Sequence, residues 1–321
     1  MPLKIGLYIG SWPQNIGNAF FDLGAKAIMK LAYPDADFYP MGGAVHWMFN
    51  ASQRINERSF VSKIKNFNNV KSENINSFER GQIAEVDLIV FAGMSMCREF
   101  AENNGRTFIE ASKRGVAILG LGAGASLYTE EDTKPFSRFF NSLERAAILT
   151  RDDDTFNIFN GDINNIESGI DCAFFLPDYY QPPKLSTPSY DIENFDTNNI
   201  PKNIDHSGRE VLYTHHDLWG PLPTHYINKP NTLVSDVPED YLTLYSQVNV
   251  THSDRVHACL ASLAYGNKAR LYSNTPRKSL FNKVNLSDIC NKVCSIDMDN
   301  LLKLKNDQIN LTRKLIDTIL T

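Results

Sequence analysis

The sequence has little of what marks secreted, zinc-bound or nucleic-acid-binding proteins. Its 321 residues include five cysteines, a small and odd number that favours free thiols in a reducing compartment. Cys290 and Cys294 are separated by three residues and have no second pair, so we expect no metal site there. The chain has no run of Lys or Arg and a net charge of −5, which argues against a nucleic acid as its main partner.

Signals for a membrane are also missing. The first ten residues lack the basic start, long apolar core and small-residue cleavage site of a signal peptide. The most apolar stretch, residues 116–128, is too short to cross a bilayer. We therefore expect a cytoplasmic protein whose contact with the inner face of a membrane is peripheral at most.

What the sequence does contain is an alternation of apolar strands and amphipathic helices. Hydrophobic residues make up 42% of the chain, enough for packed cores. Strands are predicted at 4–10, 36–39, 86–92, 116–121, 146–150, 210–214 and 233–237, and helices at 15–32, 98–113, 134–145, 238–248 and 298–320. Strands with continuous apolar content between helices are typical of a parallel sheet covered on both faces.

The alternation is interrupted by residues 176–208, which are rich in Pro, Asn and Asp. We expect an N-terminal Rossmann-like domain over residues 1–180, a linker over 181–208, and a C-terminal Rossmann-like domain with a long terminal helix over 209–321. Two α/β domains of this kind face each other across a cleft, and ligands bind beyond the carboxyl ends of their strands.

The segment 249–273 predicts a strand, a helix, a glycine stop and a second strand. Its helix begins with two basic side chains, Arg255 and His257. The first turn of a helix carries partial positive charge, so bases are disfavoured there unless a negative ligand binds. Taken alone, His257 is also consistent with a structural histidine.

Two glycine-containing loops follow predicted strands. Asn15, Gly17 and Asn18 lie where a helix begins, and they either face a substrate or, for Asn15, cap the helix. Gly122 belongs to a Gly-Leu-Gly-Ala-Gly run that differs from the dinucleotide-binding fingerprint. Its backbone either approaches a ligand such as a phosphate or only packs tightly.

Three further groups of basic side chains lie at the ends of predicted strands or at the starts of predicted helices. Arg151 either pairs with Asp152 or binds a carboxylate or phosphate. The acids at 152–154 are consecutive and cannot converge on a metal. His215 and His216 are adjacent at a strand end and point in opposite directions, so at most one is expected to face a ligand. Arg277 and Lys278 begin another predicted helix, where the helix dipole disfavours positive charge. They either bind an anion or form a solvated pair.

Taken together, these motifs resemble those of the polysaccharide pyruvyl transferases. The resemblance covers most of the chain, and its most specific block is Arg255-Val-His-Ala258 with the following helix and Gly266. Its other elements are Asn15-Ile-Gly-Asn18, Arg151-Asp152 and Arg277-Lys278.

The resemblance implies a GT-B-like fold, phosphoenolpyruvate as donor, and a saccharide acceptor that is in some cases lipid-linked. It implies no further cofactor and no metal. The donor would bind on the C-terminal side and the acceptor on the N-terminal side. By motif, His257 would be the general acid and Arg255 its helper. Arg151 and Lys278 (or Arg277) would bind the donor's anionic groups.

One position departs from the family pattern. Where the family often has an acid, this chain has Asn18, and Asp22 lies one turn later on the same helix face. Asp22 is therefore the candidate base. Two other functions remain open at this point: a GT-B glycosyltransferase that uses a nucleotide sugar, and a catalytically silent relative that binds a sugar or an anion.

Overall fold

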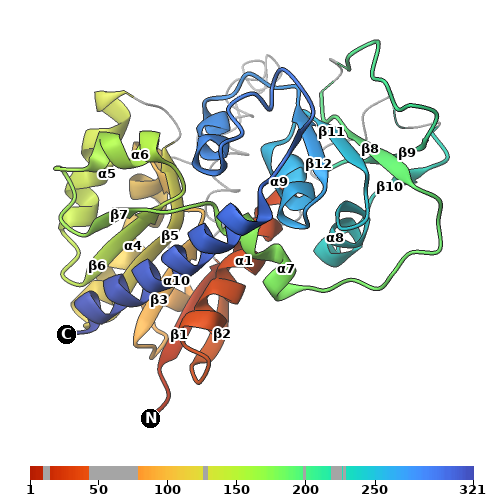
Figure 1. Cartoon of the computed structure of the whole chain (residues 1–321). Helices are drawn as coiled ribbons and strands as arrows, with labels where there is room; N and C mark the ends of the chain where they lie inside the picture. Colours follow the sequence, from red (N-terminus) through yellow and green to blue (C-terminus); the bar gives the residue numbers. More distant parts are fainter. Residues whose placement is uncertain (10–14, 43–78, 126–128, 198–199, 218–225, 227–228) are drawn as a thin grey trace, which may run out of the picture.

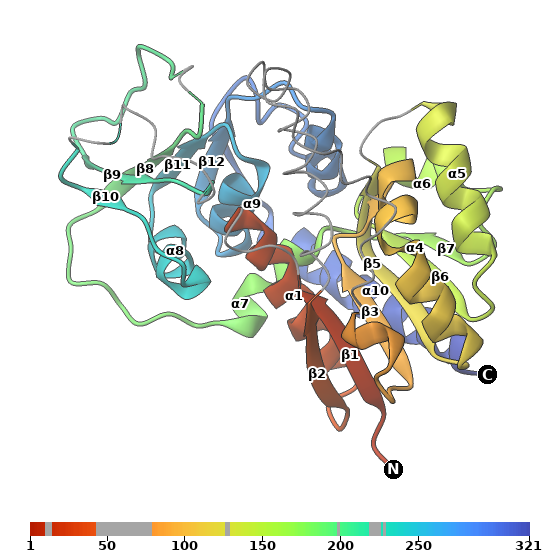
Figure 2. The same ribbon diagram turned by 180° about the vertical axis from the view of Figure 1, so that it is seen from behind.

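The computed structural model describes residues 1–9, 15–42, 79–125, 129–197, 200–217, 226 and 229–321. Within them the chain forms two α/β lobes, each built around one sheet (Figure 1). Seen from behind, the two sheets remain separate, and α1 lies between them (Figure 2). The prediction of two Rossmann-like domains is confirmed at the level of fold.

The first sheet has the strand order β2-β1-β3-β5-β6-β7, with β4 beside β5, and all its pairs are parallel. Its strands are β1 (Lys4–Ile9), β2 (Asp37–Gly42), β3 (Leu88–Ala92), β4 (Ser95–Met96), β5 (Ala117–Ala125), β6 (Ala146–Thr150) and β7 (Ile166–Ser168). The helices along this part of the chain are α1 (Gly17–Ala32), η2 (Arg80–Gln82), α4 (Arg98–Lys113), α5 (Glu130–Asn141), α6 (Asp153–Phe159), η3 (Cys172–Phe175) and α7 (Leu176–Tyr179).

The second sheet has the order β10-β9-β8-β11-β12-β13, and only β13 is antiparallel. Its strands are β8 (Tyr190–Asn194), β9 (Glu210–Thr214), β10 (Thr232–Leu233), β11 (Val250–Ser253), β12 (Lys268–Leu271) and β13 (Cys294–Ser295). The helices of this half are α8 (Pro238–Tyr245), α9 (Val256–Ala264), η4 (Pro276–Val284) and α10 (Met298–Leu320).

The predicted linker 181–208 is wrong, because it contains a central strand of the second sheet. Strand β8 pairs with β9 on one side and β11 on the other, and all five of its residues are buried. Its sequence has polar residues at three of five positions, so no apolar run marks it. The buried polar groups are instead satisfied across the sheet: Asn194 donates to Thr214 and accepts from Ser253.

The predicted loop at residues 122–125 is also wrong, because β5 continues through it. The glycines allow other parts of the chain to pack closely against the strand. Gly122 has φ +65°, and an added Cβ would lie 2.6 Å from the Cys172 sulfur. At Gly124 an added Cβ would lie 2.3 Å from Nε of Arg151.

The long C-terminal helix follows the second lobe in sequence but packs on the first, against α1, β5 and β6 (Figure 1). Its assignment to the C-terminal domain is therefore wrong. Gln308 on α10 is buried and binds both backbone groups of Ile170: its Oε1 accepts from the amide at 3.0 Å, and its Nε2 donates to the carbonyl at 3.1 Å.

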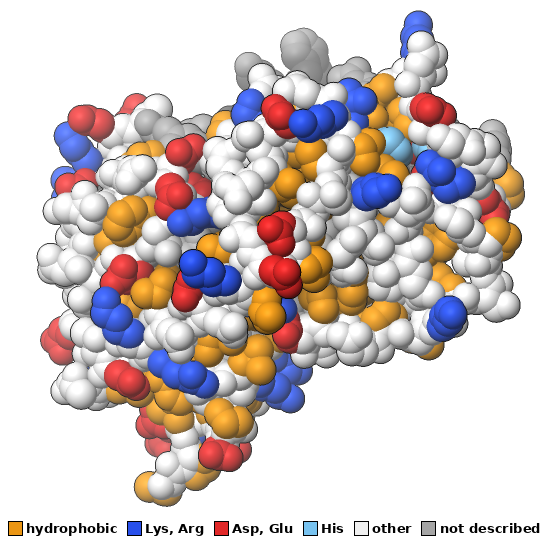
Figure 3. All heavy atoms as spheres, in the orientation of Figure 1, with side chains coloured by type: hydrophobic (Ala, Val, Ile, Leu, Met, Phe, Trp, Pro, Cys, Tyr) orange, Lys and Arg blue, Asp and Glu red, His pale blue; other side chains and the backbone are white. Residues whose placement is uncertain are grey.

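One hydrophobic cluster runs through both lobes and includes Phe20, Phe174, Tyr241 and Leu260. A second cluster fills the opposite face of the first sheet. The face shown in Figure 3 has acidic and basic side chains interspersed, with no large patch of one sign. Among the described residues, no helix is long and apolar enough to cross a membrane.

Candidate functional site

The predicted site residues from the two lobes meet where α1 and α9 begin. The backbone amide of Ile16 donates to the carbonyl of His216 at 2.9 Å. A Cβ added to Gly17 would lie 3.3 Å from Nδ1 of His216 and 3.3 Å from Cβ of His257. Gly17 therefore lets the start of α1 approach both histidines, and the ring of Phe21 lies 5.4 Å from that of His257.

His257, in the first turn of α9, faces a buried carboxylate of the first lobe. Its Nε2 lies 3.7 Å from Oδ2 of Asp171, an electrostatic contact too long for a hydrogen bond. Asp171 is 2% exposed, and its other oxygen accepts from the amide of Ala173 at the start of η3. Burial opposes ionisation of Asp171, but His257 and Arg151 outweigh it and hold its pKa below the usual value.

Arg151 is buried at the end of β6, against the backbone of Gly124. Its Nε lies 3.5 Å from Oδ2 of Asp152, so the pairing considered from sequence is present. Oδ1 of Asp152 accepts from the amide of Thr155 and caps α6. Arg151 therefore combines a pairing with Asp152 and an electrostatic effect on Asp171.

Arg255 precedes the first turn of α9 and pairs with Asp196, which follows β8. His215 places Nδ1 2.8 Å from Oδ1 of the same carboxylate. Burial opposes the ionisation of Asp196, but His215, His216 and Arg255 outweigh it and hold its pKa well below the usual value. The positive charge before α9 is thus partly balanced by the protein's own acids.

His216 lies in the contact between the lobes. Its Nε2 is 2.7 Å from the hydroxyl of Tyr245, and its ring meets the edge of Phe20. Burial lowers the pKa of His216 to about 3, so the ring is neutral at pH 7. Among the two adjacent histidines, His215 faces the charged cluster and His216 joins α8 to α1.

The remaining N-terminal candidates lie along the start of α1. Oδ1 of Asn15 accepts from the amide of Gly17 at 2.9 Å, the local bonding role considered from sequence. Asn18 is partly exposed in the first turn. Asp22 is 2% exposed, and its charge contributes, after burial and Asp171, to raising the pKa of Cys172.

Arg277 and Lys278 lie at the exposed start of η4. Nζ of Lys278 donates to Asn274, and its side chain lines a cavity of about 540 Å³ with Asp154 and Asn157 of α6. Among the described residues, no hydrogen bond or ion pair joins Lys278 to Arg151. The structure thus brings together Arg151, Arg255 and His257 but leaves Lys278 outside their contacts.

Two acids of the cluster, Asp171 and Asp196, were not identified from the sequence. Asp196 follows β8, which was assigned to a linker, so the rule that site residues follow strands was not applied there. Asp171 comes three residues after β7. That strand has only three residues and ends in polar side chains, so no apolar pattern marks it. Recognition of either strand would have pointed to the acid that follows it.

The arrangement of the lobes matches solved structures at low sequence identity. A UDP-N-acetylglucosamine 2-epimerase from Rickettsia bellii has a TM-score of 0.54 at 11% identity, over 99% of this chain and 98% of that one. The S. aureus MnaA structure with UDP has a TM-score of 0.52 at 10% identity, over 98% and 91%. The Neisseria meningitidis UDP-GlcNAc 2-epimerase bound to UDP-GlcNAc has 0.50 at 11%, over 98% and 94%.

These likenesses define the class of fold: two Rossmann-like lobes in the GT-B-like arrangement. The family follows from the sequence, because the family model for polysaccharide pyruvyl transferase matches residues 15–275. The chain belongs to the polysaccharide pyruvyl transferase family, and the resemblance in its motifs is confirmed. No protein with a curated description matches it.

Proposed function

We propose that the chain transfers the pyruvyl group of phosphoenolpyruvate to a saccharide precursor of a surface polysaccharide or lipopolysaccharide. The products would be a cyclic pyruvate ketal on two neighbouring hydroxyls and inorganic phosphate. The observation that carries the proposal is that buried Arg151 and His257 both act on Asp171, with the partly exposed Arg255 two residues before His257, all within the matched family segment.

Phosphoenolpyruvate carries a phosphate and a carboxylate, so its site needs several positive groups close together. Arg151 faces Asp152, and Arg255 faces Asp196 and, at 3.9 Å, the half-exposed Asp217. A guanidinium has five N–H donors and can hold a carboxylate and a ligand at once. The amino end of α9 adds unpaired backbone N–H groups beside Arg255.

His257 is the proposed general acid. Its Nε2 faces Asp171, which stays ionised, so the carboxylate orients the ring and Nδ1 is left to donate a proton. Protonation of the donor's methylene carbon would make the adjacent carbon electrophilic. One acceptor hydroxyl then attacks that carbon, and the second displaces phosphate to close the ketal.

Asp22 is the proposed base for the acceptor hydroxyl. It lies four residues after Asn18 on α1, the helix whose start contacts His257 through Gly17 and Phe21. Residues four apart share a helix face, so Asp22 presents a carboxylate on the face where Asn18 presents an amide.

The test combines donor binding with product analysis. We expect phosphoenolpyruvate to raise the melting temperature of the protein, and UDP-sugars to leave it unchanged. With a panel of glycosides that carry neighbouring hydroxyl pairs, mass spectrometry should detect the ketal and release of equimolar phosphate. Stabilisation by nucleotide sugars alone would overturn the proposal, and so would donor binding without turnover on every acceptor.

A further inference from the structure

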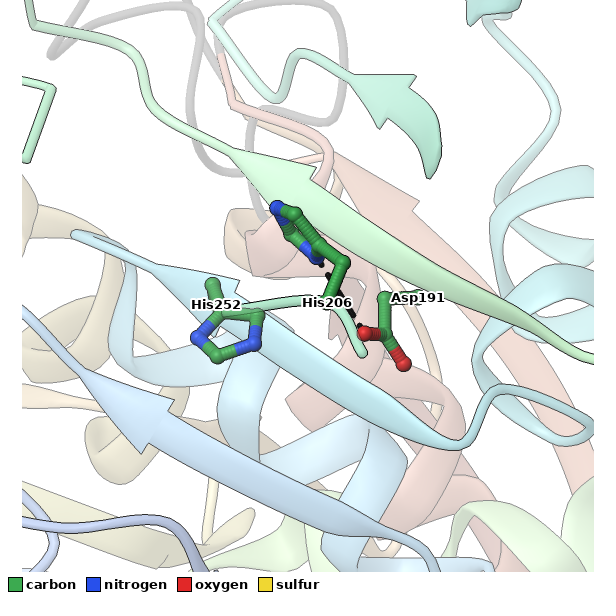
Figure 4. Close-up of side chains that lie close together, drawn as sticks. All are labelled: Asp191, His206 and His252. Atoms are coloured by element: carbon green, nitrogen blue, oxygen red, sulfur yellow. Dashed lines mark hydrogen bonds and ion pairs between the residues drawn. The ribbon is translucent and has the colours of Figure 1, made fainter. Parts of the chain in front are cut away.

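A second cluster of histidine and carboxylate side chains lies in the sheet of the second lobe. It consists of Asp191, His206 and His252 (Figure 4). One potential ligand atom from each residue lies within 4.8 Å of the other two. Asp191 and His252 are buried, and His206 is partly exposed.

The sheet itself brings these residues together. Strands β8 and β11 are neighbours, and His252 is in register with Glu193, which points to the same face as Asp191 two residues earlier. His206 belongs to the connection between β8 and β9, which returns to this face. Asp191 lies near the amino end of β8 and His206 precedes the amino end of β9, whereas His252 is the third of the four residues of β11.

His252 provides a buried nitrogen that has no partner among the described residues. Its side chain is 3% exposed, and Nδ1 lies 3.1 Å from the hydroxyl of Tyr272, which follows β12. Nε2 is buried and makes no hydrogen bond to the part of the chain that the structure describes. Because β11 lies between β12 and β8, a ring whose Nδ1 meets Tyr272 turns its other edge toward Asp191, as Figure 4 shows.

Neighbouring polar side chains hold His206 and Asp191 in place, as is common for the side chains that bind metals. Nδ1 of His206 is 3.2 Å from Oδ2 of Asp191, and its Nε2 is 3.0 Å from Oε1 of Glu193. Arg209 donates to both oxygens of Asp191, and Asn249 donates to its Oδ1. Ligating histidines commonly donate their second N–H to a carboxylate or another oxygen, and ligating carboxylates are hydrogen-bonded in turn.

We propose that Asp191 Oδ2, His206 Nδ1 and His252 Nε2 bind one divalent transition-metal ion, with Zn²⁺ as the preferred ion. Two nitrogens and one carboxylate oxygen suit zinc, and bonds of about 2.0–2.1 Å in tetrahedral geometry place ligand atoms about 3.4 Å apart. The 3.2 Å separation of His206 and Asp191 is already close to that value. A water takes the fourth position.

The metal would brace the second sheet. It would tie β8, β11 and the β8–β9 connection together. Its ligand Asp191 lies five residues before Asp196, the carboxylate that contacts Arg255 and His215. We expect a structural role, because Asp191 and His206 lie toward the amino side of β8 and β9, opposite to the edge where ligands of such sheets bind.

The experiment measures Zn²⁺ on the full chain. Protein stripped with a chelator is dialysed against Zn²⁺, bound metal is measured by mass spectrometry, and affinity is measured by competition with a chromophoric chelator. We expect one zinc per chain and a rise in melting temperature on adding zinc. His206→Gln and His252→Gln should each weaken binding at least about tenfold.

Two controls fix the location. His257→Gln removes a histidine from the other histidine–carboxylate cluster and should keep zinc binding. Asp288→Asn removes an exposed acid and should do the same. The proposal is overturned if wild-type protein binds no stoichiometric zinc. It is also overturned if folded His206→Gln protein binds zinc as tightly as wild type, or if His257→Gln abolishes binding.

Discussion

Among the described residues, histidines pair with carboxylates in two regions. The two regions differ in their position relative to the ends of the strands. His257 and Asp171 follow β11 and β7 beyond their carboxyl ends, at the contact between the lobes. His206 and Asp191 lie toward the amino side of β9 and β8, within one lobe. Ligands of open α/β sheets bind at carboxyl ends, so the first pair lies where a ligand is expected and the second pair does not.

The largest expected effect is a difference in kcat between histidine substitutions in the two regions. His257→Gln should lower kcat about 10²–10⁴-fold, because the general acid is lost. The matched change His206→Gln should leave kcat within about threefold at 25 °C, well below the loss of a general acid. Phosphate release from phosphoenolpyruvate measures both, and circular dichroism checks their folding. Near-normal turnover by folded His257→Gln protein would remove that residue from the mechanism.

Asp171→Asn tests whether the carboxylate acts through His257. We expect kcat to fall about 10²-fold, since an amide cannot stabilise positive charge on the imidazole. A purely structural role would lower the amount of folded enzyme without changing the pH profile of kcat. We therefore expect the alkaline limb of that profile, where a general acid is lost, to shift in the variant, and an unchanged profile would contradict the proposed role.

His216 should make the protein sensitive to acid. Burial is the main reason that the pKa of His216 in the folded protein falls to about 3. The charge of Asp196 opposes this shift but has a smaller effect than burial, and the charges of Arg255, His257 and His215 lower the pKa further. The unfolded chain binds a proton near pH 6.5 and the folded chain does not. Stability is therefore retained above pH 6.5 and falls below it, by about 2 kcal/mol between pH 6.5 and 5.

Urea unfolding at pH 7 and pH 5 measures this effect. His216→Gln should lower stability at pH 7 through loss of the contact with Tyr245, yet show a smaller difference between the two pH values. Equal pH dependence in both proteins would show that His216 does not control it.

The smallest expected effect compares a buried cation with an exposed one. Arg151→Gln should weaken phosphoenolpyruvate binding about tenfold, the scale of one charge-assisted hydrogen bond of about 1.5 kcal/mol. Lys278→Gln should change binding less than about threefold, because an exposed charge is screened by solvent. Calorimetric titration measures both, and a larger loss for Lys278 would move the donor site toward η4.

The sequence predicted the regular, apolar parts of the fold better than the polar ones. Strands β3 and β6 were found from their apolar runs, and α9 from its Val256, Leu260 and Leu263 stripe. Strand β8 was missed because its buried Asp191, Glu193 and Asn194 are satisfied by partners distant in the sequence. No local pattern contains that information.

The same reason explains the candidate site. Arg255, His257 and Arg151 were identified because bases at helix starts and strand ends conflict with local rules. The acids that oppose them, Asp171 and Asp196, obey local rules and become notable only through contacts made by folding. Lys278 and Arg151 were expected to share one ligand, but Lys278 lies outside the contacts of Arg151, so we now expect the titration above to separate them.

The hold of Gln308 on Ile170 has a consequence for biosynthesis. The residue after Ile170 is Asp171, so the carboxylate opposite His257 is fixed by a helix near the other end of the sequence. A ribosome makes the first sheet long before it makes α10, and the nascent first lobe lacks this clamp until then. The protein should therefore gain catalytic competence late in translation, and chains arrested before residue 308 should contain both histidine clusters but remain inactive.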